Sequence, residues 1–315
     1  MPYDAPICLS CGSTELHHWG TATDREYFST SDRFDYFLCT HCRAMSISPV
    51  PDDRLHEIYP ANYYSVVVTN PSLIERVKMA LDRRLFRRIL RPLRGEFLTA
   101  LDVGGGTGWL LQQAKAAEPR LTSTAVVDLD PAAAPAAEAA GHTYFCGRIE
   151  DYEPDREFDL VLMMNLIEHV KDPVQVLKKI GACLKPNGRI VLKTPNYDSL
   201  DARLFRTSYW GGLHCPRHWV LFTPESLTEA VERAGLRVVE ISLTQGAPFW
   251  TWSIANLLAR RGLIKLSADA PVYRHPLVPF LMAAFAALDF ARRPFMRTSQ
   301  MFAILSQRGP ESPSA

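Results

Sequence analysis

Apolar and polar positions follow a repeating pattern from about residue 97 onward. Helical stretches, for example 109–117 and 172–184, separate short apolar runs that are typical of strands. The apolar runs lie at 98–103, 124–128, 158–163 and 188–193. Strands that alternate with helices predict an α/β fold, a doubly wound parallel sheet with helices on both faces.

The C-terminal part of the chain carries clear helix and strand signals. In "TPESLTEAVERAGL", Thr223 is a typical N-cap, Pro224 suits the first turn, and Gly235 ends the helix. The remaining expected elements are a strand at 237–243, a helical insertion at about 247–297, a last strand at 300–307 and a disordered tail at 309–315. With these elements the domain extends over residues 97–308 and has a seven-stranded sheet.

Residues 1–50 have a different character and predict a separate zinc ribbon. Two C-x-x-C pairs can each wrap one side of a tetrahedral zinc, and four thiolates leave no open position, so the site would be structural. The four candidate ligands are Cys8, Cys11, Cys39 and Cys42. Gly12 suits a knuckle turn, whereas Arg43 occupies the matching place in the second pair. The segments "DREYF" and "RFDYFL" are expected to form a small hairpin. Coincidental pairing of free cysteines is the alternative.

Two further segments leave their role open. Residues 51–96 are expected to be a linker and a basic amphipathic helix, because 71–94 carry eight Lys or Arg against two acids and an apolar stripe. The stripe comprises Leu73, Val77, Leu81, Leu85 and Ile89. The apolar stretch at 276–288 is too short to span a bilayer, which needs about 20 residues. Each segment either packs against the protein or lies on a membrane surface. For 276–288, the packed alternative is a helix of a lid or of a dimer contact.

Composition and charge narrow the class of protein. The chain is 47% hydrophobic and 22% charged, as an ordinary globular protein is. A formal net charge of +1 argues against a nucleic-acid partner unless a local patch supplies the attraction. The start "MPYDAPICL" lacks the basic and apolar regions of a secretory signal, so we expect a cytoplasmic protein with reduced thiols. Peripheral contact with the inner membrane surface is left open.

The segment "LDVGGGTGWLL" indicates a ligand-binding loop. Glycines between a strand and a helix let backbone N–H groups approach a ligand closely. The G-x-G-x-x-G spacing of dinucleotide folds fails, because Trp109 occupies the third position. The pattern present is Asp102 followed by Gly104, Gly106 and Gly108, and Asp128 ends the next apolar run in "VVDLDP". An acid at that place can accept both hydroxyls of a ribose.

These residues resemble the class I S-adenosylmethionine-dependent methyltransferases, over about residues 97–245. "FDLVLMMNLIEHVKDP" and "LKPNGRIVLKTPN" look like the fourth and fifth strand regions of that family. The resemblance implies a Rossmann-like methyltransferase fold that binds S-adenosylmethionine. It places the glycines near the methionine part, Asp102 near its ammonium group and Asp128 on the ribose. The remaining cofactor contacts that it implies are Leu129, Ile149, Glu150 and Asn165, with Arg148 where many members have an acid.

The segment "SYWGGLHCPRHWVLF" follows the fifth strand, where this family admits its acceptor. Its aromatic, imidazole and cationic side chains suit a sugar or another polyol. Trp210, His214 and Arg217 are the candidate substrate contacts. His218 resembles a recurrent histidine of the family and is the candidate base, with a purely structural role as the alternative.

The ribbon and the domain together resemble a bacterial group of methyltransferases that modify glycans or natural products. We therefore expect methyl transfer to a small or glycan-like acceptor, with lipid-linked acceptors left open, at an oxygen atom. Enzymes that methylate the exocyclic amines of nucleic-acid bases have a characteristic motif after the fourth strand. This chain has "NLIE", from Asn165 to Glu168, at that place, which argues against this kind of N-methylation. A zinc-ribbon RNA methyltransferase and a non-catalytic cofactor-binding module are the alternatives, and the oligomeric state is left open.

Overall fold

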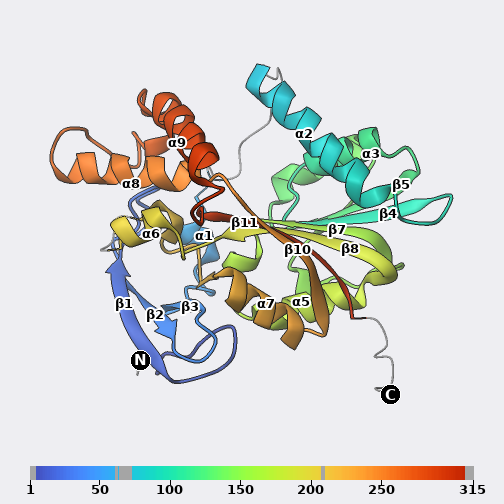
Figure 1. The fold of residues 1–315 in the computed structure, drawn as a ribbon, viewed down its shortest axis with the longest axis horizontal. Helices are drawn as coiled ribbons and strands as arrows, with labels where there is room; N and C mark the ends of the chain where they lie inside the picture. Colours follow the sequence, from blue (N-terminus) through green and yellow to red (C-terminus); the bar gives the residue numbers. More distant parts are fainter. Residues whose placement is uncertain (1–4, 61–62, 64–72, 207–209, 309–315) are drawn as a thin grey trace.

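The computed structural model describes residues 5–60, 63, 73–206 and 210–308. Its main parts are a large central sheet between helices, a small sheet that contains the N-terminal residues, and a pair of helices beside them (Figure 1). The small sheet and the helix pair lie at the same end of the central sheet. The cavity described below is lined by residues that follow strands of the central sheet and by Tyr59 and Trp219 from segments next to the small sheet.

The central sheet has the seven strands that the sequence predicts. In spatial order they are β10 (Leu236–Thr244), β11 (Gln300–Gln307), β8 (Leu184–Pro195), β7 (Phe158–Met164), β4 (Leu98–Val103), β5 (Leu121–Asp128) and β6 (Thr143–Cys146). The strands from β8 to β6 are parallel, and β11 pairs antiparallel with β8 and with β10.

The strand order creates a switch point beside β4. The chain runs from β4 outward through β5 to β6, and then returns to the other side of β4 to form β7 and β8. Loops that follow β4 and β7 therefore diverge in opposite directions. Ligands of open α/β sheets bind in the crevice that such a reversal leaves at the carboxyl ends of the strands.

Helices cover both faces of the central sheet, as a doubly wound fold requires (Figure 1). One face carries α2 (Leu73–Leu90), α3 (Trp109–Ala117) and α4 (Ala134–Ala139), and the other carries α5 (Pro173–Ala182) and α7 (Pro224–Arg233). The predicted start of α7 is confirmed: the Thr223 hydroxyl accepts a hydrogen bond from the Ser226 N–H, and the Ser226 hydroxyl accepts one from the Thr223 N–H.

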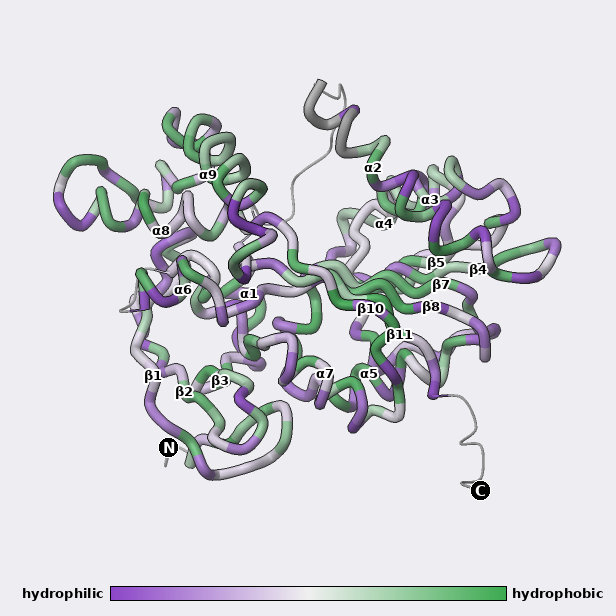
Figure 2. The backbone as a smooth tube through the Cα atoms, in the orientation of Figure 1, coloured by the Kyte–Doolittle hydropathy of each residue, from purple (hydrophilic) through white to green (hydrophobic). Residues whose placement is uncertain are grey.

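Alternate residues of β4 belong to two hydrophobic cores. Leu101 and Val103 pack in one core, while Leu98 and Ala100 pack in the other. This alternation follows from the two-residue period of a strand that is covered on both faces. Apolar residues accordingly follow the central strands in Figure 2.

The N-terminal residues form a small antiparallel sheet that continues into the rest of the protein. Its strands are β1 (Leu16–Ala22), β2 (Phe34–Cys39), β3 (Met45–Ser48) and β9 (Val220–Leu221). Because β9 is part of the predicted acceptor segment, the sheet joins residues 16–48 directly to that segment. The N-terminal unit is therefore packed into the protein, although the sequence predicts a separate ribbon.

One predicted hairpin strand is wrong. "RFDYFL" forms β2 as expected, but "DREYF" is a turn, and β1 precedes it. The reason is the Asp24 carboxylate, which accepts hydrogen bonds from the backbone N–H groups of Glu26, Tyr27 and Ser29 at 2.9–3.1 Å. A side chain that takes three backbone donors of its own segment prevents their use in a strand.

Helix α2 lies where a basic helix is predicted, but its buried face differs from the predicted stripe. Phe86, Ile89 and Leu90 are buried, whereas Leu81 is 60% exposed. The side chains of Leu73 and Val77 lie outside the described residues. Only the C-terminal turns of α2 therefore contribute described side chains to the core.

The predicted helical insertion before the last strand is confirmed as α8 (Ala247–Arg260) and α9 (Val278–Arg292). Helix α9 buries Asp289 and Arg292 and exposes apolar side chains such as Phe280 and Phe290. Asp289 accepts hydrogen bonds from the Gly246 N–H and the Trp250 ring. No helix in the described ranges is both long and apolar enough to cross a bilayer. The predicted tail at 309–315 lies outside the described residues.

Two short α-helices and several turns of 3₁₀ helix are the remaining elements of the described residues. Helix α1 (Leu55–Ile58) precedes the cavity residue Tyr59, and α6 (Leu200–Leu204) precedes the predicted acceptor segment. Short turns of 3₁₀ helix, among them 167–169 and 211–213, lie next to the same region. The described part of the acceptor segment, residues 210–222, is almost entirely buried.

Candidate functional site

A cavity of about 470 Å³ lies at the switch point of the central sheet. Its walls come from the residues that follow β4, β5 and β7, and from a short N-terminal stretch around Tyr59. The size is within the range of roughly 300–1,000 Å³ that small-molecule sites have. The cavity therefore coincides with the place where the fold predicts a ligand.

The glycine loop after β4 lines one wall of the cavity. Gly104 and Gly106 have φ values of +74° and +52°, which side chains rarely allow. Gly105 has no room for a side chain, because a Cβ there would lie 2.5 Å from Cγ of Asp102. Glycine at these places lets the backbone lie close to the Asp102 carboxylate and also close to a ligand in the cavity.

Asp102 is a buried carboxylate that lacks a partner among the described residues. It is 1% exposed, and neither of its oxygens has a hydrogen bond. Burial and the nearby Asp128 raise the pKa of Asp102 to about 7. An unpartnered carboxylate in a cavity wall suits a cationic group such as an ammonium.

Asp128 ends β5 and faces the same cavity. One of its carboxylate oxygens accepts from the Gly106 N–H at 2.7 Å, and the other accepts from the Asp130 N–H at 2.9 Å. Each oxygen keeps a further lone pair. Asp128 can thus fix the glycine loop and still accept hydrogen bonds from a diol.

The other predicted cofactor residues are mostly brought together. The cavity lining includes Leu129, Ile149, Glu150 and Asn165, and also Arg148. The lining does not include Gly108, whose missing Cβ leaves room for the His142 ring, 2.4 Å from where that atom would be. Gly108 is therefore placed as a packing glycine at the start of α3.

Another part of the cavity lining, here called the acceptor end, includes two tyrosines, Tyr59 and Tyr63, to which sequence reasoning assigned no role. Tyr59, Tyr63 and Trp219 take part in the lining, together with His169. The Tyr59 hydroxyl lies 2.8 Å from Nδ1 of His169, and the same nitrogen lies 3.0 Å from the Arg217 carbonyl. Single tyrosines in a linker carry no motif, so the sequence contained no signal for their place here.

The predicted acceptor residues lie behind this end and do not line the cavity. His218 is buried, and its Nδ1 lies 2.8 Å from the Gly212 carbonyl. Burial, with the neighbouring His169 and His214, holds the pKa of His218 well below its usual range. Its ring centroid lies 4.8 Å from that of His169. His218 therefore does not reach the cavity itself but contacts the imidazole of His169, which does.

Trp210 and Arg217 are committed to partners within the protein. The Trp210 ring N–H donates to Asp201 at 2.8 Å. Arg217 is fully buried and forms an ion pair with Asp24 at 2.8 Å. Their polar groups are thus used by the fold, and the geometry favours structural roles over the predicted substrate contacts.

The four N-terminal cysteines converge on one point. Their sulfur atoms all lie within 4.8 Å of one another, with Cys8 and Cys42 at 3.5 Å and Cys11 and Cys39 at 3.6 Å. Zinc–sulfur bonds of about 2.3 Å in a tetrahedron separate sulfurs by about 3.8 Å. The residues therefore fit a zinc ion.

Both knuckles have the same local geometry. Gly12 has φ of +77° and donates to the Cys8 carbonyl, and Arg43 has φ of +60° and donates to the Cys39 carbonyl. Arg43 thus adopts the conformation that glycine favours, although the residue type obscures it in the sequence. The Ala44 N–H also points at the Cys42 sulfur, at 3.4 Å.

A second group with metal-ligand atoms lies at the acceptor end of the cavity. Atoms of Glu168, His169 and His218 lie within 4.8 Å of one another. Thr194 donates to one Glu168 oxygen, and the other oxygen has no hydrogen bond within the described residues. Burial raises the pKa of Glu168 to about 8, so without a cation this carboxyl is mostly protonated at neutral pH.

The strand order, the glycine loop and the acid at the end of β5 define a Rossmann-like fold with a cofactor site at its switch point. Residues 74–241 match the family described as "Methyltransferase domain", more than half of the 315 residues. The chain belongs to this family and is an S-adenosylmethionine-dependent methyltransferase.

Two relatives carry the name ubiquinone biosynthesis O-methyltransferase. The protein of Nitrobacter winogradskyi is 32% identical over 206 residues, which cover 59% of this chain and 75% of the relative. The protein of Rhodopseudomonas palustris strain HaA2 is 34% identical over 221 residues, which cover 64% of this chain and 79% of the relative.

Among solved structures, coclaurine N-methyltransferase bound to N-methylheliamine and SAH shares the fold. The TM-score is 0.50 with 14% identity, and the match covers 77% of this chain and 76% of that one.

Proposed function

We propose that this methyltransferase acts on a hydroxyl oxygen of a small acceptor and that its N-terminal cysteines hold a structural zinc. When bound, S-adenosylmethionine supplies an electrophilic methyl group, whose bond to sulfur breaks as the new bond to the acceptor forms. The protein must hold the acceptor in line and provide a place for its proton.

The observation that carries the proposal is the chemistry of the acceptor end. Tyr59, Tyr63 and His169 line it, so phenol and imidazole groups face the place where an acceptor would enter. Such groups can hydrogen-bond a hydroxyl and orient it. The O-methyltransferase names of the relatives are consistent with an oxygen acceptor.

The size of the cavity supports a small acceptor group. About 470 Å³ must contain the cofactor and the reacting part of the acceptor. A glycan or lipid-linked acceptor would therefore insert one ring or hydroxyl group and extend into solvent. The exposed apolar side chains of α9 would give a lipid-linked molecule, or a membrane surface, a place to lie.

The proposed cofactor contacts follow from the cavity wall. Asp128 would accept the ribose hydroxyls, the loop from Gly104 to Gly106 would carry the methionine part, and the unpartnered Asp102 would face its ammonium group. Ile149 and Glu150 would lie at the adenine. These roles are supported by the orphaned carboxylate and by the close backbone approach that the glycines permit.

His218 receives a different role from the one that the sequence suggests. We propose that it acts on the acceptor only through its edge-to-face contact with His169, because it is absent from the cavity lining. A buried imidazole whose pKa lies well below its usual range is a weak proton acceptor. His218 is thus proposed as a positioning residue.

The zinc proposal follows from the sulfur geometry. Hydrogen bonding to Cys8 and burial raise the pKa of Cys42 well above its usual range, so four thiolates at this spacing need a cation to neutralise them. Four cysteine ligands leave no position for a substrate. The metal would therefore hold residues 8–42 together and take no part in methyl transfer.

A labelling experiment tests the proposed function. Cell extract is incubated with the protein and trideuteromethyl S-adenosylmethionine, and the products are followed by mass spectrometry and NMR. We expect a small molecule to gain the label on oxygen, and the Asp128→Ala variant to label much less. Label on nitrogen or carbon would contradict O-methylation, and label in the RNA fraction would favour the RNA alternative. An absence of labelled product with normal cofactor binding would favour a non-catalytic module.

A further inference from the structure

Helix α9 exposes apolar side chains and buries its charged ones. Its charged residues are Asp289 and Arg292, and both are buried in an ion pair at 2.7 Å. The residues of α9 that are exposed to solvent are all apolar, and the large ones among them are Phe280, Leu288 and Phe290. A surface helix of a globular protein has the opposite arrangement, with polar residues outside and apolar residues toward the core.

The inner face of α9 is fixed to α8, so the apolar face points outward in the folded protein. The Phe285 ring stacks on the Trp250 ring, with centroids 5.1 Å apart. Asp289 accepts hydrogen bonds from the Gly246 N–H and from the Trp250 ring. Turning the apolar face inward would break these contacts and expose the stacked rings.

The apolar surface continues beyond both ends of α9. Leu277 precedes the helix and is 41% exposed, while Phe295 and Met296 follow it and are 86% and 46% exposed. Over the described residues 276–296, Arg293 is the only exposed charged side chain. The hydrophobic colours extend along α9 in Figure 2. Single exposed apolar residues are ordinary, but a continuous apolar surface marks an interaction site.

Basic residues flank this apolar surface in the chain. Residues 247–297 contain seven Lys or Arg and two acids, and one of the acids, Asp289, is buried. Asp269 is thus the only exposed acid of this segment, all of which the structure describes. Exposed basic residues near the two ends of α9 include Arg261, Lys265, Arg274 and Arg293.

We propose that α9 and its flanks form a docking surface for an anionic membrane. The helix lies in the plane of the membrane surface, with Phe280, Leu288 and Phe290 inserted at the boundary between headgroups and acyl chains. The flanking Lys and Arg side chains contact the anionic headgroups. The contact is peripheral, because α9 has 15 residues and a membrane span needs about 20.

The charges favour a membrane over a second copy of the chain. In a twofold dimer the same surface of both chains meets. The basic residues around α9 would then approach one another, with Asp269 as the only exposed acid that each chain contributes from this segment. Anionic headgroups attract all of these cations and also leave the acyl chains to take up the apolar face.

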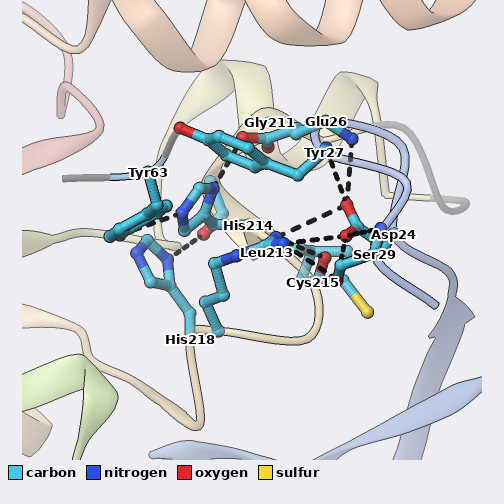
Figure 3. A network of polar contacts seen from close by, with 12 residues as sticks. Asp24, Glu26, Tyr27, Ser29, Tyr63, Gly211, Leu213, His214, Cys215 and His218 are labelled. Atoms are coloured by element: carbon cyan, nitrogen blue, oxygen red, sulfur yellow. Dashed lines mark hydrogen bonds and ion pairs between the residues drawn. The ribbon is translucent and has the colours of Figure 1, made fainter. Parts of the chain in front are cut away.

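The connection between α8 and α9 reaches the acceptor end of the cavity. The Tyr273 ring lies 5.8 Å from the Tyr27 ring, which lies 5.3 Å from the ring of the cavity residue Tyr63. Figure 3 shows Tyr27 and Tyr63 beside His214. A lipid-linked acceptor would therefore approach from the docked side. This consequence rests on the proposed function, whereas the docking itself does not.

Vesicle flotation of the full chain tests the docking. The vesicles contain phosphatidylcholine alone, or phosphatidylcholine and phosphatidylglycerol in equal parts. We expect the protein to float with the mixed vesicles at low salt, and to bind far less to phosphatidylcholine alone or at high salt. Phe280→Ala and Phe295→Ala should each weaken the binding about tenfold. Arg293→Gln should weaken it about fivefold, on the mixed vesicles only.

Phe97→Ala is the matched control, because Phe97 is 64% exposed between α2 and β4. It should bind the mixed vesicles as the wild-type protein does. Wild-type protein that floats with neither kind of vesicle would overturn the proposal, and so would equal binding of Phe97→Ala and Phe280→Ala. Because these phenylalanines face solvent, all variants should keep the wild-type affinity for S-adenosylmethionine in calorimetry, a readout that does not depend on methyl transfer.

Two further measurements locate the contact. Hydrogen exchange over 276–296 should slow when mixed vesicles are added, and slowing confined to α2 would overturn the proposal. In analytical ultracentrifugation without vesicles, the mass of the protein should be the same for wild type and Phe280→Ala. A dimer that Phe280→Ala dissociates would assign the surface to a second copy and overturn membrane docking.

Discussion

Replacing Asp24 by Asn should destabilise the whole protein, although Asp24 lies in the N-terminal unit. The substitution keeps the shape of the side chain but removes the negative charge beside Arg217. Both side chains of this ion pair are fully buried, with their atoms 2.8 Å apart. Removing one partner of a buried pair leaves an uncompensated charge, which typically costs about 3–5 kcal/mol.

The pKa of Asp24 gives a second estimate of the magnitude. Burial raises this pKa. The hydrogen bond and charge of Arg217, with the N–H groups of Ser29 and Tyr27, lower it by more, so that the net change is a fall from 3.8 to about 2. That shift corresponds to about 2.4 kcal/mol of stability. For a carboxyl with a depressed pKa, this stability is present above pH 4 and is lost as the pH falls toward 2. We therefore expect Asp24→Asn to lower the free energy of unfolding by about 2–5 kcal/mol at pH 7.

Urea denaturation at pH 7, followed by circular dichroism, measures this change. Asp32→Asn is the matched control, because its exposed pair with Arg54 should contribute less than about 1 kcal/mol. The double variant Asp24→Asn, Arg217→Met should recover part of the loss, since no unpaired charge remains buried. Equal stabilities of Asp24→Asn and Asp32→Asn would refute the reasoning.

The parts of the fold that the sequence predicts are those with local signals. The apolar run of β4, the glycines after it and the cap at Thr223 each act within a few residues, and all three occur where expected. The pairing of Asp24 with Arg217 joins residues 193 positions apart, and no local pattern announces it. The segment "DREYF" forms no strand for a different, local reason, because the Asp24 side chain accepts backbone N–H groups of its own segment.

The residues of the candidate site also fall into two groups, those with a local sequence signal and those placed by contacts between distant segments. Asp102 and Asp128 follow directly from strand ends, so this wall of the cavity could be predicted from the sequence. The other wall includes Tyr63, which reaches the cavity from a separate segment, and behind it lies His214, whose partner Glu26 belongs to the N-terminal unit. Arg217 and Trp210 looked like substrate contacts because their residue types suit a sugar, but burial in the fold uses their polar groups.

Three further predictions follow from the zinc, cofactor and surface proposals. Elemental analysis should find one zinc in the wild-type protein and in Cys183→Ser, and none in Cys39→Ser; metal-free wild-type protein would contradict the zinc site. Asp128→Ala should weaken S-adenosylmethionine binding about tenfold or more in calorimetry, because hydrogen bonds to a charged group contribute about 1.5–3 kcal/mol; an unchanged affinity would place the ribose elsewhere. Phe280→Glu should reduce sedimentation with anionic vesicles, and wild-type protein that stays in the supernatant would contradict membrane contact.

A crystal structure with S-adenosylhomocysteine tests the central claim most directly. The account predicts that the ribose hydroxyls lie on the Asp128 carboxylate and that the amino-acid part crosses the loop from Gly104 to Gly106. The sulfur should then point toward the end of the cavity lined by Tyr59, Tyr63 and His169. A cofactor bound in the reverse direction, or with its sulfur directed away from these residues, would contradict the account.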